Sequence, residues 1–137
     1  MQIQIRSLQH VGIPVTDIKR SEAFYQSLGF TNHMQAYFPY GEEDKGTCIM
    51  MQLGSITIEL YEMPEPDNSE VRNRKNGHID HIAFDVADID DTYQTLKASG
   101  FIPIEPAPVK LDFWKNGCKY FNILGPDGER IEFNQIL

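Results

Sequence analysis

An internal duplication restricts the folds open to this chain more than any other feature of its sequence. Residues 79–86 read as a strand with His81 on one face and apolar residues on the other, and residues 8–15 repeat that pattern around His10. Further landmarks recur at the same spacing of 71 residues: Asp17 and Asp88, Gly29 and Gly100, and Phe30 and Phe101. Several landmarks at one spacing indicate two copies of one supersecondary unit.

A chain of 137 residues fits a single domain with a sizeable core. We expect two half-domains to share that core, with a first module over about residues 1–63 and a second over about residues 78–137. Residues 64–77 are polar, charged and interrupted by prolines, which is typical of a linker.

Composition excludes several classes of partner and location. The net charge of −8 disfavours binding to nucleic acid or to an anionic membrane surface. No apolar run approaches membrane-spanning length, and we expect no secretory signal at the N-terminus. Cys48 and Cys118 fall at nearly matching places in the two halves, so pseudo-symmetry is expected to keep them apart and reduced. We therefore predict a cytoplasmic protein.

The two halves predict the same order of elements, β-α-β-β-β, and hence an α+β fold. In the first half we expect a strand at 3–15, followed by a helix that Asp17 caps and Gly29 ends. The apolar face of this helix is expected to contain Ile18, Phe24, Tyr25 and Leu28. A strand and a mobile loop are expected within 31–47, and then strands at 48–53 and 56–61, joined by a hairpin at 54–55. In the second half we expect a strand at 79–86, a helix capped by Asp88 and stopped by Gly100, a short strand at 101–104, an aromatic loop, and strands at 119–124 and 129–134 joined by a turn at 125–128.

Strand alternation decides which polar side chains can converge. In the last strand of the first half, Glu59 shares a face with Thr57 and Tyr61. In the last strand of the second half, Glu132 shares a face with Asn134. Each half therefore combines a strand histidine with a late-strand glutamate.

Two such pairs, facing each other across a pseudo-two-fold axis, would form a site from His10, Glu59, His81 and Glu132. Imidazole and carboxylate together suit a divalent first-row metal, so we predict one nickel, cobalt, zinc or manganese ion per site. With two waters the ion would be octahedral and able to activate a substrate oxygen. A lone strand histidine is usually structural and a lone strand glutamate usually faces solvent, but the recurrence of both favours ligands.

Other polar and aromatic residues near these segments have weaker claims. His78, Glu62 and Glu129 each lie three residues from a predicted ligand, and an odd offset on a strand points to the opposite face. Phe113 and Trp114 could line a substrate pocket or simply cover the core, and both readings stay open.

The four segments that carry the predicted ligands resemble those of the vicinal oxygen chelate superfamily, also called the glyoxalase/bleomycin-resistance/dioxygenase fold. The resemblance extends over essentially the whole chain and rests on LQHVGIPV, ITIELYE, IDHIAFDV and GPDGERIEF. It implies paired βαβββ modules that form a curled mixed sheet around a metal cleft. Dimers are common in the superfamily, which implies a homodimer, with the four ligands drawn from one chain or from two.

Within that superfamily the His-Glu-His-Glu set is similar to glyoxalase I, the lactoylglutathione lyase family. The resemblance implies a metal-dependent lyase or isomerase that acts on the hemithioacetal of methylglyoxal and glutathione. It also implies that Glu132 is the catalytic base and Glu59 its pseudo-symmetric counterpart. A carboxylate at a metal can remove a proton next to a carbonyl because the Lewis acid stabilises the developing charge on oxygen.

Two positions depart from the glutathione-dependent pattern. Glyoxalase I usually has an arginine four residues after the first ligand, where this chain has Pro14, and tends to have an asparagine four residues after the second, where this chain has Met63.

The alternative is an enzyme similar to methylmalonyl-CoA epimerase, whose first strand resembles HVGIPV equally well. Fosfomycin-type transferases and ring-cleaving dioxygenases typically use two histidines and one glutamate. A metal-free drug-sequestering protein of the same fold is the alternative from another class.

Overall fold

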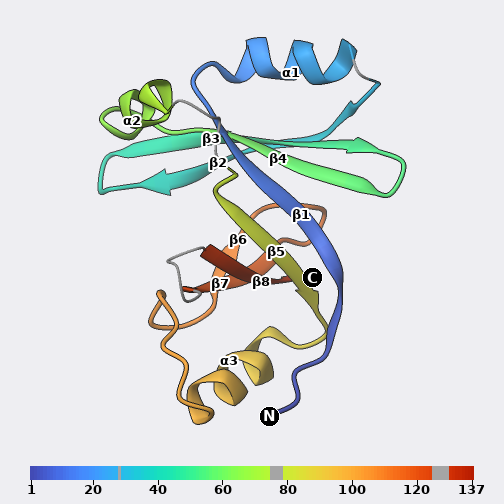
Figure 1. Cartoon of the computed structure of the whole chain (residues 1–137), viewed down its shortest axis with the longest axis vertical. Coiled ribbons are helices and arrows are strands. Elements are labelled where there is room, and N and C mark those ends of the chain that lie inside the picture. Colours follow the sequence, from blue (N-terminus) through green and yellow to red (C-terminus); the bar gives the residue numbers. More distant parts are fainter. Residues whose placement is uncertain (28, 75–78, 125–129) are drawn as a thin grey trace. The chain divides into compact units, whose positions relative to one another are not determined.

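The structure of the chain is a computed structural model that describes residues 1–27, 29–74, 79–124 and 130–137. Its elements, shown in Figure 1, are β1 (Ile5–Val15), α1 (Ile18–Ser27), β2 (Thr31–Tyr40), β3 (Asp44–Leu53), β4 (Ile56–Glu62), α2 (Asp67–Asn73), β5 (His81–Val86), α3 (Ile89–Ala98), β6 (Val109–Leu111), β7 (Cys118–Leu124) and β8 (Arg130–Ile136). They fall into two compact units. The central unit comprises His10–Asp80, and the terminal unit comprises Met1–Gln9 together with His81–Leu137.

The central unit is a mixed sheet covered by α1. Its strands are hydrogen-bonded in the order β2-β3-β4-β1, with β1 parallel to β4 and the other neighbours antiparallel. The core between helix and sheet contains Val15, Ile18, Ile49, Met51, Ile58 and Leu60, with Ile13, Tyr25 and Phe30 at its edge. One face of β4 thus packs on the helix and leaves Glu59 on the other face.

The terminal unit repeats this arrangement around α3. Its strands are ordered β5-β8-β7-β6, and the first and last strands of the second module, β5 and β8, are again parallel. The core contains Val86, Ile89, Tyr93, Leu96, Phe121, Ile123 and Phe133. These observations confirm the predicted α+β class built from two βαβββ modules. No helix among the described residues has the length and apolar character needed to cross a membrane.

The duplication extends to the helix caps. Asp17 Oδ1 accepts a hydrogen bond from the Arg20 backbone N–H at 3.0 Å, and Asp88 Oδ1 accepts one from the Asp91 N–H at 2.9 Å. Both N-caps were predicted from the sequence, and both satisfy a backbone donor that the first helical turn leaves unpaired.

Three expectations about local structure were wrong. Phe24 lies on the outer side of α1 and is 58% exposed, because it follows Ile18 by six residues and so sits well away from it around the helix axis. The segment 31–47 has no long mobile loop: β2 pairs with β3 as far as Tyr40 and Asp44, around a turn at Gly41 with φ of 63°. Residues 101–104 form no strand, since Pro103 has no backbone N–H to donate, and β6 at Val109–Leu111 takes that place.

The remaining expectations concern the linker, one turn and one residue of the first helix. The predicted linker holds the short helix α2, in which Asn68 is buried and donates to the Thr16 carbonyl oxygen at 3.2 Å. The turn predicted at 125–128 and Leu28 on the predicted helix face fall outside the described residues.

Candidate metal centre

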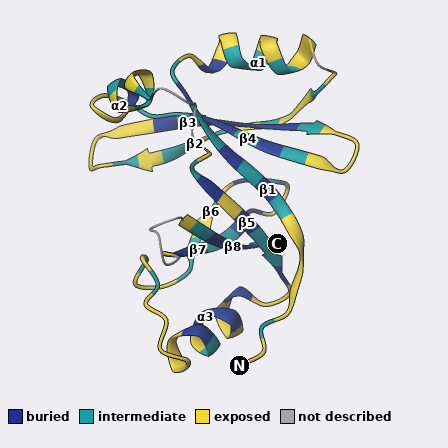
Figure 2. Cartoon of the chain, viewed as in Figure 1, coloured by how far each residue is buried: buried dark blue, intermediate teal, exposed yellow. Residues whose placement is uncertain are grey.

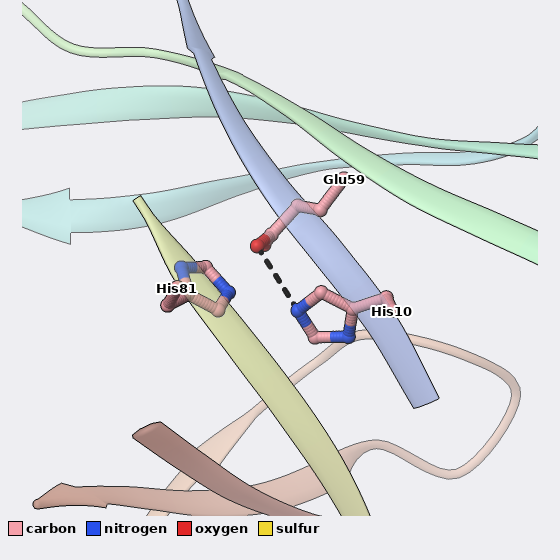
Figure 3. Close-up of side chains that lie close together, drawn as sticks. All are labelled: His10, Glu59 and His81. Carbon is pink, nitrogen blue, oxygen red and sulfur yellow. Dashed lines mark ion pairs between the residues drawn. The ribbon is translucent and has the colours of Figure 1, made fainter. Parts of the chain in front are cut away.

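The central unit brings His10 and Glu59 together. His10 lies on β1 and is 2% exposed, and Glu59 lies on the adjacent parallel strand β4, level with Gly12. The Nε2 atom of His10 is 3.2 Å from Glu59 Oε2, as the dashed line in Figure 3 marks. The other oxygen, Oε1, accepts a hydrogen bond from the buried Cys48 thiol on β3 with a sulfur–oxygen distance of 3.4 Å.

The terminal unit brings His81 and Glu132 together in the same way. His81 begins β5 and Glu132 lies on the adjacent parallel strand β8, and both are buried. Nε2 of His81 is 3.4 Å from Glu132 Oε2. Oε1 of Glu132 accepts a hydrogen bond of 2.7 Å from the Asn134 side-chain amide, and Asn134 Oδ1 accepts one of 2.8 Å from Gln9.

The strands that carry the glutamates also hold the helices, and this accounts for the direction in which each glutamate points. Three residues after Glu59, Glu62 Oε2 accepts a hydrogen bond of 2.7 Å from the Ile18 N–H at the start of α1. Three residues after Glu132, Gln135 Oε1 accepts one of 3.0 Å from the Ile89 N–H at the start of α3. An odd offset reverses the face of a strand, so the capping residue points toward its helix and the glutamate points away from it.

The distances within each pair fit a shared metal ligand geometry. An imidazole nitrogen and a carboxylate oxygen that each lie about 2.0–2.2 Å from one ion, at right angles, are about 3 Å apart. The observed separations are 3.2 Å in the central unit and 3.4 Å in the terminal unit. His10, Glu59 and His81 supply the nitrogen and oxygen donors that a divalent metal ion needs.

Sequence reasoning placed the two pairs but missed the groups that hold their carboxylates. Asn134 was recognisable, because alternation puts it on the same face as Glu132 two residues earlier. Cys48 and Cys118 are both buried and not joined in a disulfide, in line with the expectation that they are reduced, but the contact of Cys48 with Glu59 had no sequence signal. Gln9 had no sequence signal, since its partner Asn134 lies 125 residues away.

The two predicted substrate-contact residues lie between β6 and β7 in the terminal unit. Phe113 is 3% exposed and therefore covered, whereas Trp114 is partly exposed and has a φ of 65°, in the left-handed region. A substrate contact by either residue stays a prediction.

A family model places this architecture among known proteins. The model of the Glyoxalase/Bleomycin resistance protein/Dioxygenase superfamily matches residues 7–133, a span that includes both histidine–glutamate pairs. The chain belongs to this superfamily. The resemblance inferred from the sequence motifs is thereby confirmed at the level of the superfamily.

The chain is also similar to individual proteins. The uncharacterized protein YwkD of Bacillus subtilis (strain 168) is 32% identical over 111 residues, which cover 79% of this chain and 80% of that protein. Among solved structures, methylmalonyl-CoA epimerase from Mycobacterium tuberculosis has a TM-score of 0.79 at 18% identity, covering 100% of this chain and 92% of the other. A variant of the Streptomyces coelicolor methylmalonyl-CoA epimerase in complex with 2-nitronate-propionyl-CoA has a TM-score of 0.76 at 21% identity, covering 96% and 98%. At these identities the two solved structures support the fold alone.

Proposed function

We propose that the chain is a metal-dependent lyase or isomerase that moves a proton next to the carbonyl of a small thiol adduct or thioester. The observation that carries this proposal is the repeated pair: in each unit a buried histidine Nε2 lies 3.2–3.4 Å from a buried or half-buried glutamate oxygen. A single pair of this kind is a common structural contact. Two copies at corresponding places in a duplicated chain support a common chemical use of both.

The proposed site combines His10, Glu59, His81 and Glu132 around one divalent ion. Nickel, cobalt, zinc and manganese all suit these donors.

The chain's own residues then have distinct tasks in the reaction. The divalent ion, when bound, supplies Lewis-acid stabilisation of negative charge on a substrate oxygen. The Glu132 carboxylate takes the proton from the carbon next to the carbonyl and returns it to a carbon of the product. Asn134 donates to Oε1 of Glu132 and leaves Oε2 on the side of His81. Glu59 is its pseudo-symmetric counterpart.

Two substrate classes fit this chemistry. The His-Glu-His-Glu donor set favours a hemithioacetal, as in the lactoylglutathione lyase family. An acyl thioester is the second candidate, because two methylmalonyl-CoA epimerases share this fold. Pro14 and Met63, which replace the usual glutathione-contacting residues, also favour a substrate without glutathione. The proposed homodimer and cytoplasmic location stay predictions.

The decisive experiment is metal stoichiometry after stripping and reloading with nickel, cobalt, zinc or manganese. We expect about one tightly bound ion per chain, lost both in His10→Ala and in His81→Ala. The matched control is His33→Ala, because His33 is exposed on β2 and belongs to neither pair. Two ions per chain, with each variant losing only one, would show that the pairs act separately. No bound metal under any loading would overturn the proposal and favour a metal-free binding protein.

Proton transfer is then assayed on hemithioacetals and on acyl thioesters with the metal-loaded protein. Turnover of one class identifies the substrate. If the metal-loaded protein exchanges no proton of either substrate class for deuterium from the solvent, the proposed reaction is overturned while the metal site stands.

A further inference from the structure

Glu132 lies at the end of a chain of side-chain hydrogen bonds within the terminal unit. Its Oε1 accepts from the Asn134 Nδ2 at 2.7 Å, and the Asn134 Oδ1 accepts from the Gln9 Nε2 at 2.8 Å. Asn134 is 4% exposed and Glu132 is 7% exposed, so the bond between them is buried, and the bond from Gln9 is partly buried. Hydrogen bonds to a charged carboxylate are stronger than neutral ones, and a low local dielectric strengthens them further.

Gln9 determines which end of the Asn134 amide meets the carboxylate. An asparagine side chain offers a donor on one side and an acceptor on the other, and the two ends are nearly equal in shape. Because Gln9 donates to Oδ1, the NH₂ group is turned toward Glu132. With the amide reversed, Oδ1 would face a carboxylate oxygen and the contact would become repulsive.

We infer that Asn134, oriented by Gln9, is a positioning residue that occupies Oε1 of Glu132 and presents Oε2 beside His81 as the single ligand oxygen. This inference rests on the proposed function, since it concerns how Glu132 would hold the ion. Groups in the second shell of a metal site orient its ligands, and their loss typically costs 10–100-fold in metal affinity.

The first test is titration of the metal-free protein with Co²⁺ alone. Calorimetry measures the affinity, and visible absorption reports the coordination of the ion. Asn134→Leu is expected to weaken Co²⁺ binding by about 10–100-fold. It is also expected to change the Co²⁺ absorption bands, because both oxygens of Glu132 can then reach the ion and alter the coordination number. The matched control is Gln135→Leu, the next residue on β8, which caps α3 on the opposite face and should affect the melting temperature without altering Co²⁺ affinity.

The second test compares two substitutions of Gln9, which is only partly buried and less prone to prevent folding. Gln9→Leu removes the orienting donor and should weaken Co²⁺ binding by less than Asn134→Leu does. Gln9→Glu should weaken it more than Gln9→Leu, because a carboxylate at position 9 draws the Asn134 NH₂ away from Glu132. Packing alone would give the reverse order, since glutamate is nearly isosteric with glutamine, and added negative charge alone would tighten cation binding.

The outcomes separate this inference from the proposed function. If wild type binds no Co²⁺, the proposed metal site itself fails. If wild type binds Co²⁺ and the Asn134 and Gln9 variants bind it equally well with unchanged spectra, the positioning role is overturned and the metal site stands. Thermal unfolding of each metal-free variant establishes that the affinities compare folded proteins.

Discussion

The two histidine–glutamate pairs bring the same atoms together, a histidine Nε2 and a glutamate Oε2, but the second oxygen of each glutamate has a different hydrogen-bond donor. In the terminal unit an amide N–H holds the second oxygen of Glu132 at 2.7 Å, and Gln9 holds that amide in turn. In the central unit a thiol holds the second oxygen of Glu59 at 3.4 Å, and thiols are weak donors. Duplication has thus preserved the donors and let their surroundings diverge. The more firmly held carboxylate is the one assigned as the base.

The two helices differ in how far they are buried. Four residues of α3 are buried, namely Ile89, Thr92, Tyr93 and Leu96, whereas Ile18 is the buried residue of α1 among its described positions. Figure 2 shows α1 mainly as exposed or intermediate ribbon and α3 with dark buried segments. The attachment of α1 therefore depends more on polar contacts at its ends and edges.

The largest expected effect concerns which glutamate is the base. Glu132→Gln should leave the fold intact and lower turnover by about 10²–10⁴-fold, because the amide cannot accept the proton. Glu59→Gln should cost less, and Glu65→Gln, at an exposed position outside both pairs, should cost nothing. The measurement is kcat on the active substrate class. A larger loss for Glu59→Gln would transfer the role of base to the central unit.

Changing the thiol tests whether the weaker support of Glu59 matters. Cys48→Ser replaces a weak donor with a hydroxyl and should bring the Glu59 pair closer to the terminal pair, raising Co²⁺ affinity by up to about 5-fold, or about 1 kcal/mol. Cys48→Ala should lower it by a similar factor. Calorimetric titration measures both, with Cys118→Ser as the counterpart in the terminal unit, where the sulfur lies 4.0 Å from Asn134 Nδ2 and Asn134 donates to Glu132. Equal affinities across all three variants would show that the thiol has no supporting role.

The residues that cap the two helices can be exchanged between the units. Glu62 places a charged oxygen at the N-terminus of α1, whereas Gln135 places a neutral one at the N-terminus of α3. Glu62→Gln should lower the free energy of unfolding by about 0.3–1 kcal/mol, because a negative charge is favourable at that end of a helix. Gln135→Glu should raise it by a similar amount. Urea unfolding at neutral pH checks both signs, and a stabilising Glu62→Gln would contradict the comparison.

The smallest expected effect is a loss of stability of α1 at acid pH. A hydrogen bond of 2.7 Å from Asn32 is the main cause that lowers the pKa of Glu22 below its usual 4.5, although partial burial opposes it and Lys19 adds to it. A lowered native pKa means that this stability is present above pH 4.5 and is lost as the pH falls through the native value.

The matching measurement is amide hydrogen exchange of α1 against pH in wild type and Asn32→Ala. The variant should lose this pH dependence, and the difference at neutral pH should be below about 1 kcal/mol, as is usual for surface groups. Gln26→Ala, at an exposed position on α1, serves as the control. Parallel pH profiles for wild type and Asn32→Ala would remove Glu22 from the attachment of α1.

The parts of the molecule that depend on local rules were predictable. Alternation placed Glu59 and Glu132 on the faces away from the helices, and the duplication identified their histidine partners before any coordinates. The strand expected at 101–104 was wrong because Pro103, among hydrophobic neighbours, cannot donate a hydrogen bond to a β-ladder. The hydrogen bonds that hold the Glu132 carboxylate were not predictable, since Gln9 and Asn134 meet only after residues 5–9 of β1 and strand β8 have folded into one unit.

The spacing of three between Glu59 and Glu62 on β4, and between Glu132 and Gln135 on β8, has a consequence for folding fidelity. A strand that paired one residue out of register would turn its ligand glutamate toward the helix and its capping residue away from it. One slip would thus abolish the helix cap and misdirect the ligand together. Each of the two strands β4 and β8 therefore discriminates against a shifted register twice, so a chain whose helices are correctly capped has also brought Glu59 and Glu132 to the face away from the helices.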